Sequence, residues 1–305
     1  MTDVNVAAGG FTTELFSKKI NISLNDHGKY TDIVNRKYEG EIKNQGDRVY
    51  FYTLDNLTVK DYAPNATGFD GIEYENPTGD KQALVVDQAK YISFLVDDIR
   101  EVQSNIELVD QYTKKIAVSG SQIKDRYIHG LAVANAGTKR HADAALQLTK
   151  DNVWAEVCAL YATLGRKNAL INGVDYAGKR PALVITPEIE GLVKQCSQFF
   201  ANNFGADVLR KGMIGTLGGF DVFVDTNIKT DKSGTGSAAT YSQTMVALTS
   251  DAITYAEQIT KTETLRDIRQ FGDYVRCLMV YGGTVANPDC VVTSKVTMSG
   301  LNLAA

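Results

Sequence analysis

The sequence predicts an α+β protein that combines a compact domain with extended elements. Three observations carry this prediction. Two strand-like segments flank a twenty-residue connector, one helical pattern continues for about 30 residues, and short helices and strands alternate from Asn152 onward. A chain of 305 residues has room for roughly two domains or for one domain with a large insertion, and its 44% hydrophobic content excludes global disorder.

An N-terminal arm with one small helix is expected first. Residues 11–24 carry a short helical stripe of apolar side chains, and turn-forming residues at positions 25–28 separate this stripe from the helices that follow.

The most informative region is a two-stranded finger, expected over residues 38–96. Residues 48–54 are rich in aromatic and β-branched side chains, residues 57–60 continue the alternation, and residues 84–96 form the second strand candidate. The connector at 61–80 holds five acidic residues, two prolines and no Lys or Arg. So long a connection is typical of a functional or disordered loop. Two isolated strands are marginal in water, so we expect a partner to support the finger.

A long helix follows the finger. Ser104 and Glu107 have the spacing of a capping box, and apolar residues then recur at helical intervals from Val109 to Ala134. A helix of about 30 residues is roughly 45 Å long. This length exceeds what a small core requires, so the helix is interpreted as a spine on which other parts are mounted.

The rest of the chain has the pattern of a compact α+β domain. Thr186 followed by Pro187 is a typical helix start, because Pro is tolerated at the first helical position. The expected elements are a helix over 153–164, a buried strand over 182–185, a helix with a stripe from Ile189 to Phe200, a glycine-punctuated strand over 211–224, a mobile Ser/Gly-rich loop over 229–243, strands over 245–248, 274–281 and 290–296, and a loop over 282–289.

Charge and cysteine usage exclude several classes of function. A net charge of −4 gives no basic excess with which to bind nucleic acid tightly. The four cysteines lack the spacing of a zinc or redox motif, which favours a reducing compartment. The chain has no signal-peptide pattern at its start and no apolar run of the ~18 residues that a membrane helix needs. A soluble intracellular product is expected.

No motif predicts a catalytic, cofactor or metal site. His27, His129 and His141 lie outside any metalloprotease spacing, and no nucleophile-elbow motif occurs. The glycines of residues 212–219 precede a strand, whereas a phosphate loop precedes a helix. The calcium-like start at residues 225–229 places Lys at a ligand position and lacks the closing Glu. The acidic connector could bind a cation, but a solvated or partner-facing loop is favoured.

The order of these parts, together with several ordered motifs, resembles the major capsid proteins of tailed bacteriophages, which have the Hong Kong 97-like fold. No single motif is specific, but together they span nearly the whole chain. The motifs are Glu14-Leu15-Phe16-Ser17-Lys18-Lys19-Ile20, residues 34–42, residues 46–59, Gly212-x-Ile214-Gly215-x-x-x-Gly219-Phe220-x-Val222, Phe271-Gly272-Asp273-Tyr274-Val275-Arg276, Tyr281-Gly282, and Pro288 before Val291-Val292.

The resemblance implies self-assembly into hexamers and pentamers of an icosahedral virion shell that encloses double-stranded DNA without sequence-specific binding. It implies no enzymatic activity, no cofactor and no membrane, with assembly in the host cytoplasm, a separate scaffolding protein and a portal. The finger is expected to lie across a neighbouring subunit. The expected intersubunit contact residues are Asp61, Tyr62, Asp70, Glu73, Tyr74, Glu75, Asp80, Gly234 and Gly236.

The resemblance also suggests a division of the chain. The expected parts are an N-terminal arm (1–37), an extended loop (38–96), a peripheral domain with the spine helix (97–150), an axial domain (151–255) and a return to the peripheral domain (256–305). Two alternatives remain open. One is an encapsulin-like cargo compartment of the same fold, and the other is an α+β enzyme with a long lid, which predicts a monomer or small oligomer.

Overall fold

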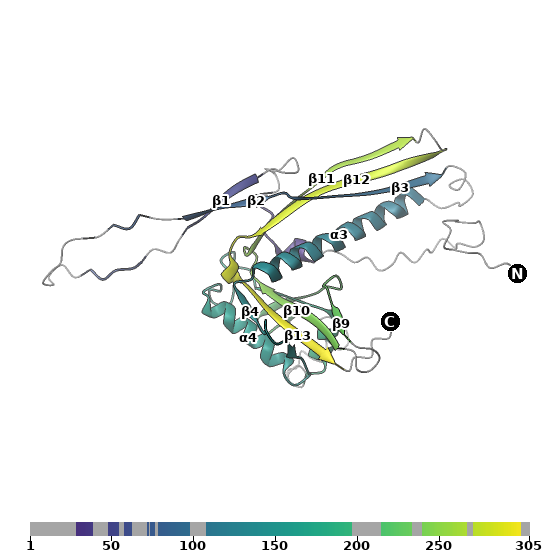
Figure 1. Ribbon diagram of the computed structural model, residues 1–305. Helices are drawn as coiled ribbons and strands as arrows, with labels where there is room; N and C mark the ends of the chain where they lie inside the picture. The colour runs from purple at the N-terminus through teal and green to yellow at the C-terminus, as the bar shows by residue number, and fades with distance from the viewer. Residues whose placement is uncertain are drawn as a thin grey trace.

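The computed structural model combines three parts that meet near one end of a long helix (Figure 1). These parts are a two-stranded ribbon, a long three-stranded sheet packed on the helix, and a compact mixed sheet. The described residues are 29–38, 48–54, 58–62, 72, 74–76, 79–97, 108–196, 215–233, 240–266 and 271–299.

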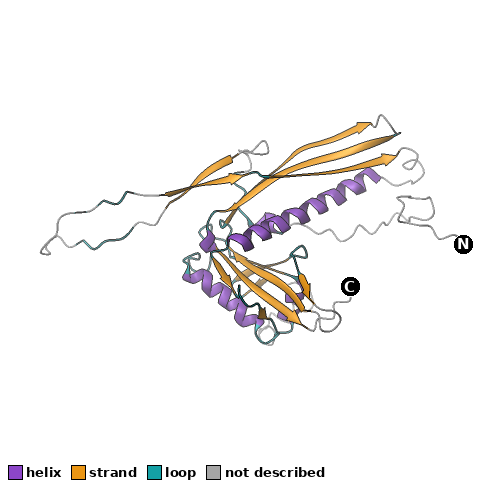
Figure 2. Cartoon of the chain, viewed as in Figure 1, coloured by secondary structure: helices purple, strands orange, loops and turns teal. Residues whose placement is uncertain are grey.

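The secondary structure alternates between long extended elements and short compact ones (Figure 2). In chain order the elements are α1 (Tyr30–Ile33), β1 (Arg48–Leu54), β2 (Gly79–Val85), β3 (Gln88–Asp97), α3 (Leu108–Asn135), β4 (Thr138–Arg140), β5 (Leu146–Gln147), α4 (Val153–Arg166), β6 (Ala182–Ile185), α5 (Pro187–Lys194), β7 (Thr216–Leu217), β8 (Phe220–Val224), β9 (Asp231–Ser233), β10 (Thr240–Leu248), β11 (Ile253–Arg266), β12 (Gly272–Val285), the 3-10 helix η4 (Pro288–Cys290) and β13 (Val291–Ser299).

The compact part is an eight-stranded mixed sheet in the order β4-β13-β10-β6-β8-β7, with β5 added to β13 and β9 added to β10. All four residues of β6 are buried, which confirms the strand expected there from its unbroken apolar run. Helix α4 confirms the expected helix, since its stripe of Val153, Val157, Leu160 and Leu164 is buried.

Helix α5 begins with Pro187 at its first position, as expected, and Thr186 is its N-cap residue. The Thr186 hydroxyl does not cap the helix but donates a hydrogen bond to Gln243 of β10, which ties the helix start to the sheet. The helix ends at Lys194, and the end of the predicted stripe, at Phe200, lies outside the described residues.

The long part is the antiparallel sheet β11-β12-β3, with α3 packed against it. Tyr127 of α3 meets Tyr281 of β12 edge to face at 5.2 Å between ring centroids. The 28 residues of α3 span about 42 Å, which confirms the expected long helix. The predicted capping box at 104–107 and the short helix predicted for 11–24 lie outside the described residues.

The segment 84–96 is not a single strand, so the prediction is wrong on this point. Strand β2 pairs with β1 from Arg48 opposite Val85 to Leu54 opposite Gly79, whereas β3 pairs with β12 of the long sheet. The chain changes sheets around Val86, whose side chain is buried against β12. The finger therefore ends at Val85, and residues 58–60 do not extend its first strand.

Three further segments differ from expectation because pairing across the chain overrides local composition. Strand β11 was not predicted, since its second half is a run of Thr, Lys and Glu, yet it pairs with β12 along its length. Parts of the loop expected at 229–243 form β9 and the start of β10. The loop expected at 282–289 begins only after Val285.

Gly282 shows why β12 passes through the expected loop. A Cβ on Gly282 would lie 2.2 Å from the Val85 carbonyl oxygen, so only glycine lets the end of β2 cross the strand.

Strand β13 falls within the expected return segment 256–305 and lies in the compact sheet. The domain boundaries themselves stay a prediction.

Candidate functional site

The described part of the chain has an elongated shape. The finger and the long sheet extend away from each other and from the compact sheet (Figure 2). This shape provides a large area for contact with other molecules.

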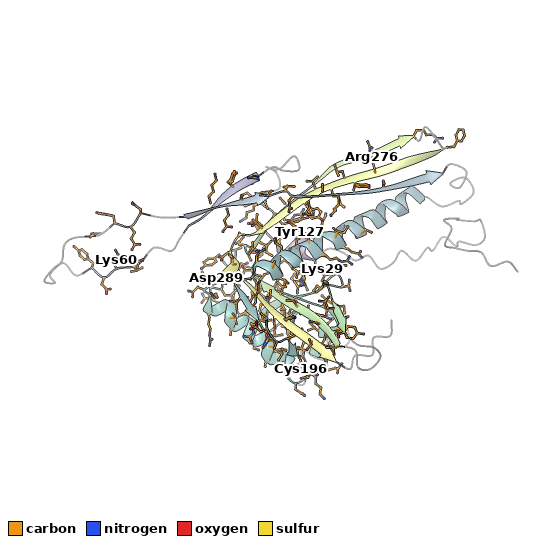
Figure 3. All side chains as sticks on the ribbon, viewed as in Figure 1. Lys29, Lys60, Tyr127, Cys196, Arg276 and Asp289 are labelled. Atoms are coloured by element: carbon orange, nitrogen blue, oxygen red, sulfur yellow. The ribbon has the colours of Figure 1, made fainter. Side chains whose placement is uncertain are left out.

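Polar contacts hold the two sides of the finger together beyond β1 and β2. The backbone N–H of Thr58 donates to Glu75 Oε2 at 3.0 Å, and Lys60 Nζ lies 3.6 Å from Glu75 Oε1. The hydrogen bond from Thr58 is the main cause that lowers the pKa of the exposed Glu75 carboxyl. Lys60 marks this outer part in Figure 3, far from the compact sheet.

Apolar side chains are exposed on the same outer part. Val59, Tyr62, Ile72 and Tyr74 expose 97%, 68%, 62% and 90% of their surface. Aromatic residues are enriched and charged ones depleted at the centre of protein interfaces. Four exposed apolar residues within the short described stretches of a thin ribbon make this outer part the candidate contact surface.

The structure brings several of the sequence-predicted contact residues to this surface. Asp61, Tyr62 and Tyr74 are exposed, and Glu75 bridges the two sides of the finger. The backbone of Asp80 pairs with Thr53 in the β1–β2 ribbon. Asp70, Glu73, Gly234 and Gly236 lie outside the described residues.

Sequence reasoning missed Val59 and Ile72. Charge patterning in the connector does not point to either residue. The available signal was the presence of isolated apolar residues within a polar segment, where no core could bury them.

A buried polar junction joins α3 to two other parts of the chain, the segment at residues 29–30 and the turn after β8. Asp125, which is fully buried, accepts the backbone N–H groups of Lys29 and Tyr30 at 3.0–3.1 Å, and Asn227 Nδ2 lies 3.4 Å from its Oδ2. Burial raises the pKa of Asp125 from 3.8 to about 6, and the nearby charge of Asp225 adds to this effect.

One helical turn further along α3, His129 contacts the same segment. Its Nδ1 lies 2.7 Å from the hydroxyl of Tyr30, whose ring is fully buried. Burial lowers the pKa of His129 from 6.5 to about 4, so the imidazole is neutral at pH 7. Burial also raises the pKa of the Tyr30 phenol. His129 is therefore a structural histidine.

The Asp225–Asn227 pair has a structural role at the same junction. Asp225 Oδ1 accepts the backbone N–H of Asn227 at 2.8 Å and so forms a tight local turn after β8. Both side chains are buried, with exposed fractions of 1% and 4%. The calcium-like spacing in the sequence thus corresponds to a turn that directs the side-chain amide of Asn227 toward Asp125 of α3.

A second buried network joins α4 to the compact sheet. Arg140 makes two hydrogen bonds to the buried Glu156, at 2.9 and 3.0 Å, and Ser294 Oγ donates to the same carboxylate at 2.8 Å. Burial alone would raise the pKa of Glu156, but these hydrogen bonds outweigh it and lower the pKa. His141, at the edge of the network, lies 3.4 Å from Glu156.

The described part of the glycine-rich segment, residues 215–219, contains a tight turn, which confirms the interpretation of these glycines as turn residues rather than a phosphate loop. Gly218 and Gly219 have φ of +56° and +92° between β7 and β8. A Cβ on Gly219 would lie 2.6 Å from the ring of Tyr161.

The described residues contain no group of three or more His, Cys, Asp or Glu that could hold a metal ion. In the same part of the chain, Cys158, Cys196 and Cys290 form no disulfide. None of the helices that the structure describes is long and apolar enough to span a membrane.

A family model described as phage capsid protein matches residues 79–294. This match extends from β2 to β13 and so includes the long sheet, α3 and most of the compact sheet. No sequence among the curated proteins matches the chain.

Solved structures resemble the chain over nearly its whole length. The structure from mycobacterium phage Che8 is 26% identical, with a TM-score of 0.74 over 93% of this chain and 97% of that chain. The capsid structure of cyanophage P-SCSP1u is 11% identical, with a TM-score of 0.70 over 94% and 93%. The capsid of Ralstonia phage GP4 is 12% identical, with a TM-score of 0.66 over 100% of each chain.

Proposed function

We propose, from the premise that this chain belongs to the family of phage capsid proteins and has the Hong Kong 97-like fold, that copies of it assemble into the hexamers and pentamers of an icosahedral head around double-stranded DNA. Its role is structural rather than catalytic. A separate scaffolding protein and a portal take part in assembly, which takes place in the host cytoplasm, and the finished shell is part of the virion.

The observation that carries the proposal is the finger. It is a two-stranded ribbon with exposed apolar side chains beyond its paired strands. A ribbon of this kind has no core of its own and is marginal in water. A neighbouring copy of the chain supplies the missing support when the finger lies across it, and symmetry repeats this contact around the shell.

The charge of the connector suits a contact between proteins more than a contact with DNA. Residues 61–80 contain five acidic side chains and no Lys or Arg. Such a segment is repelled by phosphate groups and is attracted to basic groups on a neighbouring subunit. The net charge of −4 likewise fits a container that encloses DNA without binding it tightly. The contact residues and domain boundaries expected from sequence are part of this proposal.

Removal of the outer finger tests the proposal. A chain that lacks residues 62–79 retains both large sheets, so we expect a folded protein that forms no stable shells. Size-exclusion chromatography and electron microscopy measure this, with a scaffolding partner supplied where the intact chain requires one. Robust particles from the shortened chain would show that the finger is not an assembly element.

A matched pair of substitutions refines the test. Tyr62 on the finger and Tyr176 on the compact part each expose 68% of their surface, so Y62S and Y176S remove the same side chain at equal exposure. We expect Y62S to lower particle yield more than Y176S, even though Y176S also removes the hydrogen bond from the Tyr176 hydroxyl to the Asn168 carbonyl oxygen. Equal yields would place the essential contact elsewhere. DNA in native particles distinguishes the phage head from a compartment with protein cargo.

A further inference from the structure

The junction between the two large sheets has the form of a hinge. The chain passes between the sheets three times, from α3 to β4, from β10 to β11 and from β12 to β13, and each connection is short. All three crossings gather at the same end of α3, where Asp289 is labelled in Figure 3. Short connections at one place keep the sheets together but do not by themselves set the angle between them.

A fourth segment spans this hinge without a covalent crossing. This segment is residues 29–36. The backbone N–H of Lys29, at its start, donates to the Asp125 carboxylate of α3, and the same carboxylate contacts Asn227 from the compact sheet. Tyr30 is fully buried in the core that α3 and the compact sheet share with the junction ends of β11 and β12, and His129 contacts its hydroxyl. This end of the segment is therefore fixed to the compact part and to the helix at once.

The other end of the segment is attached to the long sheet. The backbone N–H of Asn35 donates to the Ile253 carbonyl, and the Tyr255 N–H donates to the Asn35 carbonyl, each at 2.9 Å. These two bonds form a parallel bridge at the start of β11. The segment is thus hydrogen-bonded to β11 at one isolated bridge.

Glu257 of β11 reinforces the second attachment. Arg36 Nη2 lies 3.1 Å from Glu257 Oε1, and Lys124 Nζ lies 2.6 Å from Glu257 Oε2. Because Lys124 is adjacent to Asp125 on α3, the two attachment points lie on consecutive residues of the helix. Two neighbouring residues of α3 thereby connect the segment to both sheets, Asp125 through Asn227 and Lys124 through Glu257.

We propose that residues 29–36 form a strap that holds the compact sheet and the long sheet at one angle across α3, with Asp125 and Glu257 as its two anchors. The strap closes the hinge through side-chain and backbone hydrogen bonds, so it can open and close while the three covalent crossings remain intact. Because residues 1–28 lead directly into the strap, a force or a binding event on that segment is transmitted to the angle between the sheets.

Hydrogen exchange on the full-length chain tests the strap, with D125N as the main variant. The amide oxygen of the substituted side chain can take the place of Oδ1, but its NH₂ group replaces Oδ2, which accepts from the Lys29 N–H and from Asn227 Nδ2 in the wild type, so a donor then faces these two donors. Loss of hydrogen bonds to a buried carboxylate should speed exchange at the Lys29 and Tyr30 amides about ten- to hundred-fold. Small-angle scattering of the unassembled subunit should show a broader range of shapes.

Two further variants control the experiment. D32N removes an exposed carboxylate from the same short helix and should leave both exchange and scattering unchanged. E257Q releases the other anchor and should speed exchange at the Asn35 and Tyr255 amides more than at Lys29. It tests the proposal independently if D125N does not fold.

Two results would overturn the proposal. The first is exchange at residues 29–36 that is no faster in D125N and E257Q than in D32N, because the anchors then hold nothing. The second is faster exchange with an unchanged scattering profile, because the segment then moves without any effect on the angle between the sheets.

Discussion

Asp125 and His129 lie one turn apart on α3 and respond to pH in opposite directions. The pKa of Asp125 is raised from 3.8 to about 6, so the folded chain keeps this proton where the unfolded chain has lost it. Asp125 therefore contributes stability that is complete below pH 3.8 and is lost as pH rises through 6. The pKa of His129 is lowered from 6.5 to about 4, so its contribution is present above pH 6.5 and is lost as pH falls through 4.

The two contributions have similar size. Each pKa displacement is slightly more than two, which corresponds to about 3 kcal/mol of unfolding free energy at 1.36 kcal/mol per pKa unit. Between pH 4 and 6.5 the loss from Asp125 and the gain from His129 nearly cancel. The groups facing Asp125 are Asp225 and the Asn227 side chain from the compact sheet and the Lys29 and Tyr30 backbone, and His129 is not among the groups that shift its pKa. Substitution of either residue should therefore remove its own pH dependence of the unfolding free energy and leave that of the other residue unchanged.

The test compares wild type, D125N and H129Q. Relative to wild type, D125N should gain about 3 kcal/mol of unfolding free energy between pH 4 and 6.5, and H129Q should lose about as much. Urea unfolding of the unassembled subunit, followed by the fluorescence of Trp154, measures the difference. Trp154 is the only tryptophan and packs against the core that contains Tyr30. A constant difference between each variant and wild type across this pH range would refute the reasoning.

Two further predictions concern backbone crowding and a buried ion pair. G282A should lower the unfolding free energy by about 1–3 kcal/mol, because its Cβ would meet the Val85 carbonyl oxygen. G130A has no atom within 4 Å of the new Cβ and lies in a helix, so it should raise the unfolding free energy by up to about 1 kcal/mol. Urea unfolding measures both, and equal effects would contradict the crowding argument. R140A should cost about 3 kcal/mol, because it leaves the buried Glu156 without its bidentate partner, and a loss below about 1 kcal/mol would show that the carboxylate is solvated.

Local patterns were sufficient for the strongly periodic elements. The apolar residues of α4 recur at helical spacing and are buried on one face, and the four apolar residues of β6 are buried together. Pro187 marks the start of α5 for a local reason, since its fixed φ suits the first helical position. The ordered motifs also identified the capsid fold, because their sequence along the chain reflects the order of the parts.

The predicted contact site on the finger was only partly accessible to sequence. Tyr62 and Tyr74 stand out as aromatic residues in a polar connector, and both are exposed. Val59 and Ile72 give a weaker signal, because only their isolation within a polar segment marks them and a single apolar residue is ordinarily placed in a core. The structure shows that both are exposed.

What the sequence by itself determined is which segments are helical or extended and which family's order of parts they follow. Tertiary structure alone decided that the strand pattern over 84–96 divides between two sheets, that the Thr-rich β11 pairs with β12, and that Asp125 meets Lys29 and Asn227. The physical reason is distance along the chain. Periodicity reports which face of an element is buried, whereas the partners at the junction lie about a hundred residues apart in sequence and are selected only when the sheets pack.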